Sequence, residues 1–291
     1  MLRYYRKIID SCEPFVIARE AVWPSLDLAP MGLAIPPENV LDPQRVKNGA
    51  FLKLAERLDE LTYGPLALRM PSWVFYDCAL VPGAVFGYAR RAAELAPWAR
   101  KTLAVPDDYD GLVPLSMFVA IPMAHREARL VFTLASINQV APGAAPEGLW
   151  RLTLAAGTAA LDASVMVVAT QWRSSQLGLY ANLGPLRILT AWTPAHDIWA
   201  TLTFSVAADD AARERLLRGD LIPPWVVDRY LDADDTHAMR ALQAEIEAGR
   251  EVWIVGPPAI RGAETRVPLT DRGVAVGPSA EKGDFVRRFQ G

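Results

Sequence analysis

The sequence predicts a mixed α/β protein of the α+β class, with a mostly antiparallel central sheet, one parallel strand pair and flanking helices. Apolar, β-branched runs at 115–121 and 130–137 are joined by a short polar turn, which is typical of an antiparallel hairpin. A helix-length apolar segment, 149–161, then precedes a strand-length apolar run, 165–169. Because strand–helix–strand connections favour parallel pairing, we expect the strands at 130–137 and 165–169 to be parallel.

Length, charge and hydropathy exclude several classes of protein. The chain has 291 residues, and its 52% hydrophobic content is enough for a sizeable core. Thirty Lys and Arg against 33 Asp and Glu give a net charge of -3, without the clustered basic residues that a nucleic acid partner would need. No apolar run approaches the ~20 residues that span a bilayer, and no signal-peptide pattern follows the basic N-terminus. We therefore expect a cytoplasmic protein without a membrane span.

Cysteine and histidine usage gives no metal site. Cys12 and Cys78 can form neither a disulfide framework nor a zinc site, and we expect both to be buried. A reactive thiol at Cys78 stays open as the alternative, although burial would raise its pKa. His125, His196 and His237 lack metal-ligand spacing, so no metal is predicted.

The first half of the chain is predicted to contain one strand, one long helix and a hairpin. The strand is 15–19, and a proline-rich irregular passage follows it. Asp42 is the expected N-cap of a helix that runs to Gly64, with Pro43 in its first turn. The runs 73–80 and 84–89 flank a Pro-Gly pair suited to a type II turn, which indicates a hairpin.

The second half is predicted to close the sheet and then add a helical extension. A short helix beginning at Ser174 or Ser175 precedes strands at 186–190 and 199–206. We therefore place one domain at 1–207 and an extension at 208–291. The extension contains charged, amphipathic helices at 209–219 and 235–249 and a late strand near 251–256, and we expect its last ~25 residues to be partly mobile.

This order of elements resembles the GNAT superfamily of acyl-CoA-dependent N-acyltransferases over roughly residues 13–207. In that family, the loop after the fourth strand holds the cofactor pyrophosphate on backbone N–H groups and on a helix N-terminus. Here the corresponding loop supplies small residues, with Val140 where the family usually has Gln or Arg. The resemblance implies an acyl-CoA or acetyl-CoA site, whose candidate residues are Ile137, Val140, Ala141, Gly143, Ala144, Ala145 and Gln171.

The same resemblance assigns a catalytic tyrosine. The segment 171–184 is similar to the family signature Asn-x-x-Ala-x-x-x-Tyr-x-x-x-Gly-Phe, with Gln171 as the counterpart of the Asn, two residues early, and Tyr180 in register, whereas Pro185 replaces the Phe. In such enzymes the Tyr often donates a proton to the leaving thiolate, since a phenol with a pKa of ~10 is protonated at neutral pH. A buried core tyrosine is the alternative for Tyr180.

Amine acylation also needs a proton acceptor, and the strand at 130–140 contains no carboxylate. The candidates are Asp77, whose pKa burial in an apolar strand would raise, Glu147 at the end of the loop, and the pair His196–Asp197. Each also has a plain structural explanation, as a backbone hydrogen-bond acceptor, a helix-terminal charge or a turn.

We therefore expect an acyltransferase that moves an acyl group from acyl-CoA, or from an acyl carrier protein, to an amine acceptor. Many aromatic residues near the expected cleft suit an apolar acyl chain or acceptor, and a homo-oligomer is compatible with the sequence. Two alternatives stay open: a non-catalytic small-molecule-binding or scaffold protein of the same fold, and a closed antiparallel pocket of the lipocalin or hot-dog type. Parallel pairing of the strands at 130–137 and 165–169 would exclude the closed antiparallel alternative.

Overall fold

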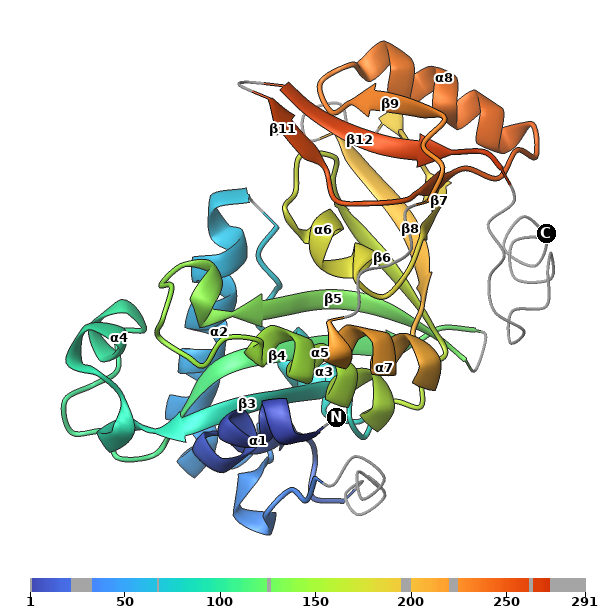
Figure 1. The fold of residues 1–291 in the computed structure, drawn as a ribbon. Helices are drawn as coiled ribbons and strands as arrows, with labels where there is room; N and C mark the ends of the chain where they lie inside the picture. Colours follow the sequence, from blue (N-terminus) through green and yellow to red (C-terminus); the bar gives the residue numbers. More distant parts are fainter. Residues whose placement is uncertain are drawn as a thin grey trace. The chain divides into compact units, whose positions relative to one another are not determined.

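The protein has a mixed α+β fold in which a mostly antiparallel sheet is flanked by helices (Figure 1). A computed structural model describes residues 2–21, 33–66, 68–124, 127–194, 200–219, 225–261 and 264–272. These residues form two compact units, which are described separately below. Within the described ranges, every helix is too short or too polar to cross a membrane.

The first unit contains residues 1–169, 182–184 and 205–222. Its helices are α1 (Leu2–Ser11), α2 (Gly49–Tyr63), α3 (Val74–Cys78), α4 (Pro97–Thr102), α5 (Leu149–Ala160) and α7 (Asp210–Arg218). Its strands are β1 (Glu13–Ile17), β2 (Val40–Leu41), β3 (Val85–Arg91), β4 (Leu112–Pro122), β5 (Ala128–Ser136) and most of β6 (Val165–Gln171). Short 3-10 turns are η2 (Pro37–Asn39), η3 (Val46–Asn48), η4 (Gly64–Leu66), η5 (Ala92–Glu94) and η6 (Ile137–Gln139).

The strands of this unit are ordered β6-β5-β4-β3-β1-β2. The pairs β5–β4, β4–β3 and β3–β1 are antiparallel, whereas β1–β2 and β5–β6 are parallel. The expected parallel pairing of the strands around α5 is therefore confirmed, and it excludes the closed antiparallel alternative. The parallel pairing of β1 with β2 is not predicted by the sequence, because a two-residue strand has no detectable period.

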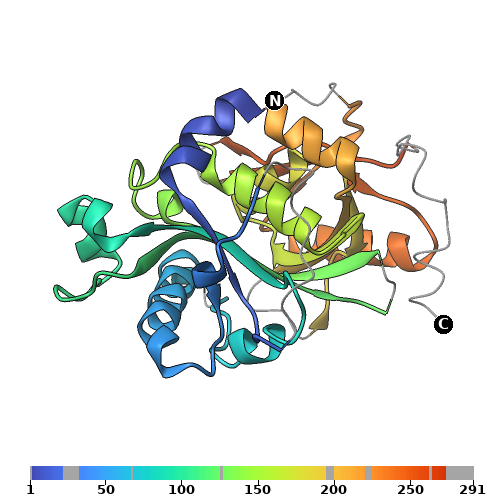
Figure 2. The same ribbon diagram turned by 90° about the horizontal axis from the view of Figure 1, so that it is seen from below.

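Helices α2 and α5 cover opposite faces of this sheet (Figure 2). On the α5 side, the buried hydroxyls of Ser116 and Thr153 are hydrogen-bonded to each other. Gly157 allows the close approach of α5 to β4, because a Cβ there would lie 2.4 Å from the ring of Phe118. On the other face, α2 contacts both β4 and β5. The sheet is thus buried on both sides, and β4 is buried along nearly its whole length.

The second unit contains residues 170–181, 185–204 and 223–291. Its elements are α6 (Gln176–Ala181), β7 (Leu186–Thr190), most of β8 (Thr201–Ala207), β9 (Arg229–Asp232), α8 (Thr236–Glu247), β10 (Trp253–Ile254), β11 (Ala259–Arg261) and β12 (Glu264–Thr270). Strand β10 pairs with β7 and β12, and β12 also pairs with β9 and β11, all antiparallel.

Helix α8 is attached to the end of β7 by side chains. The Gln243 carbonyl oxygen accepts hydrogen bonds from the backbone N–H groups of Ala191, at 2.7 Å, and Trp192, at 3.3 Å. The Arg240 guanidinium lies 4.4 Å from the ring centroid of Trp192, a favourable cation–π distance. Both helices predicted after residue 207 are present, but strands β9, β11 and β12 accompany them, so the extension is not purely helical. Of the last ~25 residues, those up to Thr270 are in β12, and 273–291 lie outside the described residues.

The predicted strand at 73–80 is wrong. This segment forms α3, which begins after a turn in which the Val74 N–H donates to the Pro71 carbonyl. Val74, Phe75 and Cys78 are buried at helical spacing, so packing overrides the β-propensity of the Val-Phe-Tyr run. The predicted Pro-Gly turn does form, with Gly83 at φ +78°, but it joins α3 to β3.

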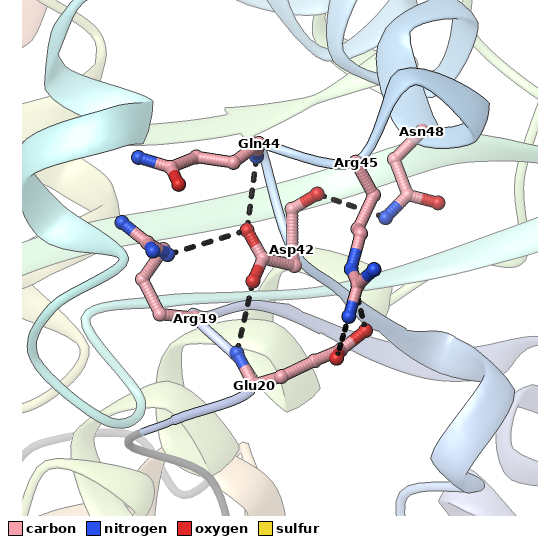
Figure 3. Close-up of polar contacts among 6 residues, drawn as sticks. All are labelled: Arg19, Glu20, Asp42, Gln44, Arg45 and Asn48. Carbon is pink, nitrogen blue, oxygen red and sulfur yellow. Dashed lines mark hydrogen bonds and ion pairs between the residues drawn. The ribbon is translucent and has the colours of Figure 1, made fainter.

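The predicted start of α2 is also wrong. The helix begins at Gly49, and Asp42 instead accepts backbone hydrogen bonds from Glu20, at 3.0 Å, and Gln44, at 2.9 Å (Figure 3). The Arg19 guanidinium lies 3.4 Å from the same carboxylate, and Arg45 pairs with the Glu20 carboxylate. This Asp42 cluster joins the chain after β1 to the chain after β2. The sequence analysis did not predict α1, which buries Tyr5 and Ile8.

We predict that Asp42→Asn lowers the free energy of unfolding by about 1–3 kcal/mol at pH 7, because it removes a charged acceptor of two backbone N–H groups. Burial raises the pKa of Asp42, but the hydrogen bonds from Glu20 and Gln44, with Arg19 and Arg45, outweigh it and hold the pKa below its ordinary value. The stabilisation is therefore present above the unfolded pKa of ~3.9 and is lost as the pH falls through the folded pKa.

Urea unfolding of the wild type and the variant at several pH values tests this prediction. Exposed Glu38 is the matched control, and Glu38→Gln should leave stability nearly unchanged. An Asp42→Asn effect that did not shrink on acidification would contradict the assigned role of the carboxylate.

Candidate functional site

The candidate site of the first unit lies at the end of β5, where its pairing with β6 stops. The parallel ladder runs from Ala128–Val165 to Val131–Val168, whereas β5 itself continues to Ser136. The register of β5 against β4 shifts at the same place, so that Phe132 is an extra residue on β5. Such a bulge bends a strand and changes the direction of its side chains. Beyond it, the free edge of β5 needs new hydrogen-bond partners.

Helix α2 supplies one of these partners through Tyr63. The buried Tyr63 hydroxyl donates to the Leu134 carbonyl at 2.7 Å and accepts from the Leu134 N–H at 3.0 Å. One phenol thereby satisfies both backbone groups of a strand residue, as a neighbouring strand would.

The second contact from α2 is a buried carboxylate. Asp59 is 1% exposed, and its two oxygens accept from the Thr133 hydroxyl, at 2.9 Å, and the Met70 N–H, at 2.7 Å. Burial raises the pKa of Asp59 and outweighs these hydrogen bonds and the charge of Arg69, which lower it. Asp59 is not among the residues predicted from the sequence. Its position does indicate burial, because it lies on the same helical stripe as buried Leu52, Ala55 and Tyr63.

The chain after β5 forms a closed loop in front of α5. Asn138 holds it together, because its side-chain oxygen accepts from the Ala145 N–H at 3.0 Å and its amide donates to the carbonyls of Ala145 and Pro146. The Gln139 side-chain oxygen accepts from the Ser136 N–H at 3.3 Å, so this side chain forms a hydrogen bond at the start of the loop. Gly143 has φ +84°, a left-handed conformation that favours glycine.

This loop exposes backbone donors. The N–H groups of Gly143, Gly148 and Trp150 have no acceptor within the described part of the chain. A Cβ on Gly143 would meet no atom within 4 Å, so the space beside it is open. Arg151 belongs to the first turn of α5, and its guanidinium lies 5.3 Å from the Trp150 ring centroid and beside Gly219, after α7. The geometry fits an anionic group held mainly by backbone N–H donors.

The structure brings six of the seven predicted cofactor-site residues to this loop. Ile137, Ala141, Ala144 and Ala145 are buried, whereas Val140 and Gly143 are exposed. The seventh, Gln171, is a nearly buried residue at the end of β6, in the second unit. Glu147, a predicted proton acceptor, is exposed on the loop two residues before α5.

The other predicted catalytic residues lie elsewhere. Asp77 is exposed on α3, so the expectation that it is buried in an apolar strand is wrong. Tyr180 lies on α6 in the second unit and is 1% exposed, with its ring 5.6 Å from that of Phe204 in an edge-to-face contact. His196 and Asp197 lie outside the described residues.

The two cysteines are buried and free. Burial, with a smaller contribution from the Asp77 charge, raises the pKa of Cys78 to about 11, and burial also raises that of Cys12. Both thiols are therefore protonated at neutral pH, as the apolar surroundings of Cys78 in the sequence indicate. In the described ranges, no three His, Cys, Asp or Glu side chains lie together in a way that could hold a metal ion.

We predict that the stability effect of Asp59→Asn depends on pH with the opposite sign to that of Asp42→Asn. An asparagine can keep both contacts, since its oxygen accepts from Met70 and its amide donates to Thr133. Because the folded pKa of Asp59 is raised, the wild type loses stability as the pH rises from the unfolded value of ~3.9 through the folded pKa. The asparagine variant does not titrate, so its stability relative to the wild type should improve over that range.

Urea unfolding between acidic and neutral pH measures this difference, with exposed Asp108→Asn as the control. A difference between wild type and Asp59→Asn that is constant across the range would contradict the raised pKa.

Comparison with known proteins does not place the chain in a family. No family model matches the sequence, and no curated protein matches it. The functional argument therefore depends on the residues and geometry described above.

Proposed function

We propose that this chain is an acyltransferase of the GNAT type, which transfers an acyl group from acyl-CoA, or from an acyl carrier protein, to an amine. One observation carries the proposal: β5 and β6 pair in parallel around α5, and β5 runs on past the ladder into a loop with open backbone N–H groups. The order of elements from β4 to β8 supports it, because strand, strand, helix, strand, short helix and two strands follow one another as the resemblance implies, whereas the predicted strand at 73–80 is helix α3.

In this proposal, the loop before α5 binds the donor. The N–H groups of Gly143, Gly148 and Trp150 would hold the pyrophosphate, helped by Arg151 and opposed by exposed Glu147. Acyl-CoA, when bound, supplies the acyl group as a thioester. Tyr180 is the candidate acid that gives its hydroxyl proton to the departing sulfur, and the acceptor amine loses its proton to a base or to water.

A non-catalytic protein of the same fold is the second candidate, and specific observations favour it. Both described candidates for the proton acceptor, Asp77 and Glu147, are exposed surface carboxylates. Tyr63 occupies both backbone groups of Leu134 on the free edge of β5. Such a protein would bind a small molecule at the loop without turnover.

We predict that Gly143→Glu abolishes or strongly weakens acetyl-CoA binding, because it adds bulk, a negative charge and strain at a positive φ where the pyrophosphate is placed. Isothermal titration calorimetry with acetyl-CoA, a long-chain acyl-CoA and free CoA measures the change. The control is Gly249→Glu, a surface glycine with positive φ after α8. Equal affinity of wild type and Gly143→Glu would rule out this loop as the donor site.

We also predict that Tyr180→Phe lowers turnover by about 10²-fold or more with little change in acetyl-CoA affinity, because it removes one proton donor and keeps the ring. Thiol release over a panel of amines measures turnover. Unchanged turnover would remove Tyr180 from the mechanism, whereas binding without any turnover in the wild type would favour the non-catalytic candidate.

A further inference from the structure

The second unit contains a groove of about 420 Å³ between α8 and β9, and β9 lies between α8 and β12 (Figure 1). Its lining includes Arg229, Tyr230, Asp232, Asp235, Ala238 and Ala241. The volume lies in the ~300–1,000 Å³ range of small-ligand sites. Two features distinguish it: all four residues of β9 line it, and α8 contributes the small side chains of Ala238 and Ala241.

Strand β9 is an edge strand whose backbone is open on one side. Within the described residues it pairs with β12 alone. The Ala233 N–H donates to the Thr265 carbonyl, and in an antiparallel ladder the hydrogen-bonded pairs alternate, so Leu231 also bonds toward β12; at the other end the Asp228 N–H donates to the Leu269 carbonyl. Tyr230, between them, therefore directs its N–H and C=O away from β12.

The partner of Tyr230 supports the same orientation. Tyr230 is opposite Pro268, which has no N–H and whose carbonyl accepts from the Val255 N–H on the other side of β12. The pair Tyr230–Pro268 is thus of the non-hydrogen-bonded type. An unpaired donor and acceptor at Tyr230 provide the template for one additional strand.

The charges at the groove favour a basic side chain in that strand. Arg229 is paired with Glu245 through two hydrogen bonds of 2.9 and 2.7 Å, and Arg266 is paired with Glu264. Asp232 and Asp235 form no ion pair within the described part of the chain, and each uses one oxygen for a backbone N–H. The groove therefore has two neutralised arginines and two carboxylates; Asp232 also interacts with the charge of Arg173, whose hydrogen-bond partner is Asp234, and each carboxylate keeps one oxygen free of these backbone hydrogen bonds.

We propose that this groove binds an extended peptide segment of a partner protein by β-strand addition to β9, with a lysine or arginine of the peptide beside Asp232 and Asp235. The backbone of the peptide would pair with Tyr230, and its inward side chains would lie over Ala238 and Ala241. This proposal is independent of the acyltransferase proposal, because it uses none of the same residues.

The probe is a capped, fluorescent peptide of alternating threonine and valine with one central arginine. Its counterparts carry glutamate in place of the arginine, or N-methyl groups on the amides that face the edge. Binding to the full chain is measured by fluorescence anisotropy, and the amide resonances of Tyr230 and Asp232 are followed by NMR. We expect the arginine peptide to bind and to shift these amides, and the glutamate and N-methylated peptides to bind about tenfold more weakly or less.

Three variants locate the contact. Ala241→Trp fills the groove and should abolish binding, whereas Ala244→Trp, on the same helix outside the groove, should not. Tyr230→Pro removes the outward N–H but no hydrogen bond to β12, because this N–H points away from β12. It should weaken binding about tenfold relative to Tyr230→Ala, which keeps the N–H. Asp232→Asn keeps the acceptor for the Asp234 N–H and should reduce the preference for arginine over glutamate.

Two results would overturn the proposal. The first is no binding of any peptide at millimolar concentration, or binding that Ala241→Trp and Tyr230→Pro leave unchanged while circular dichroism shows both variants folded. The second is dimerisation of the chain itself through β9, seen as concentration-dependent sedimentation that Ala241→Trp abolishes, because the groove would then be filled by a second copy.

Discussion

The structure of the first unit depends on the point at which β5 and β6 stop pairing. Up to Val131 and Val168 the two strands form backbone hydrogen bonds with each other. Beyond that point, the edge of β5 that faces away from β4 needs hydrogen-bond partners outside the sheet. Tyr63 provides them at Leu134, and Asp59 anchors the neighbouring Thr133. Helix α2 therefore does more than cover the sheet, because its polar side chains take the place of a missing strand.

Two buried carboxylates stabilise this unit in opposite ways. Asp42 joins the segments after β1 and β2, and its backbone donors and two arginines compensate the loss of hydration, so its pKa falls. Asp59 has one backbone donor and one hydroxyl, and Arg69, the cation that lowers its pKa, is largely exposed, so burial dominates and its pKa rises. The sign of each shift thus follows from the balance between burial, which raises the pKa, and the donors and cations around the carboxylate, which lower it.

The sequence predicts those parts of the fold that have a long and clear period. The apolar helix before Val165 and the strand runs on either side of it lead directly to the parallel pair β5–β6. Sequence reasoning fails where local propensity and packing disagree. Val74 and Phe75 have a high propensity for strands, but in the structure both are buried on helix α3. Strand β9 is not predicted, because its four residues, two of them charged, show no alternation of apolar and polar side chains. In the candidate site, the resemblance to the GNAT family leads to the loop residues, but the hydrogen bonds of Asn138 within the loop and of Asp59 to Thr133 depend on the folded structure.

The same physical requirement, that backbone donors and acceptors have partners, connects the site with the groove. At Leu134 the requirement is met within the chain by Tyr63. In the loop before α5 it is unmet for the N–H groups of Gly143, Gly148 and Trp150 within the described residues, and such donors beside a helix N-terminus suit an anion. At Tyr230 a donor and an acceptor are open together along a strand edge, and only another peptide backbone offers both in the same spacing. The arrangement of the open groups therefore distinguishes the two surfaces: N–H donors beside a helix N-terminus suit an anion, and a donor and an acceptor on one strand edge suit another strand.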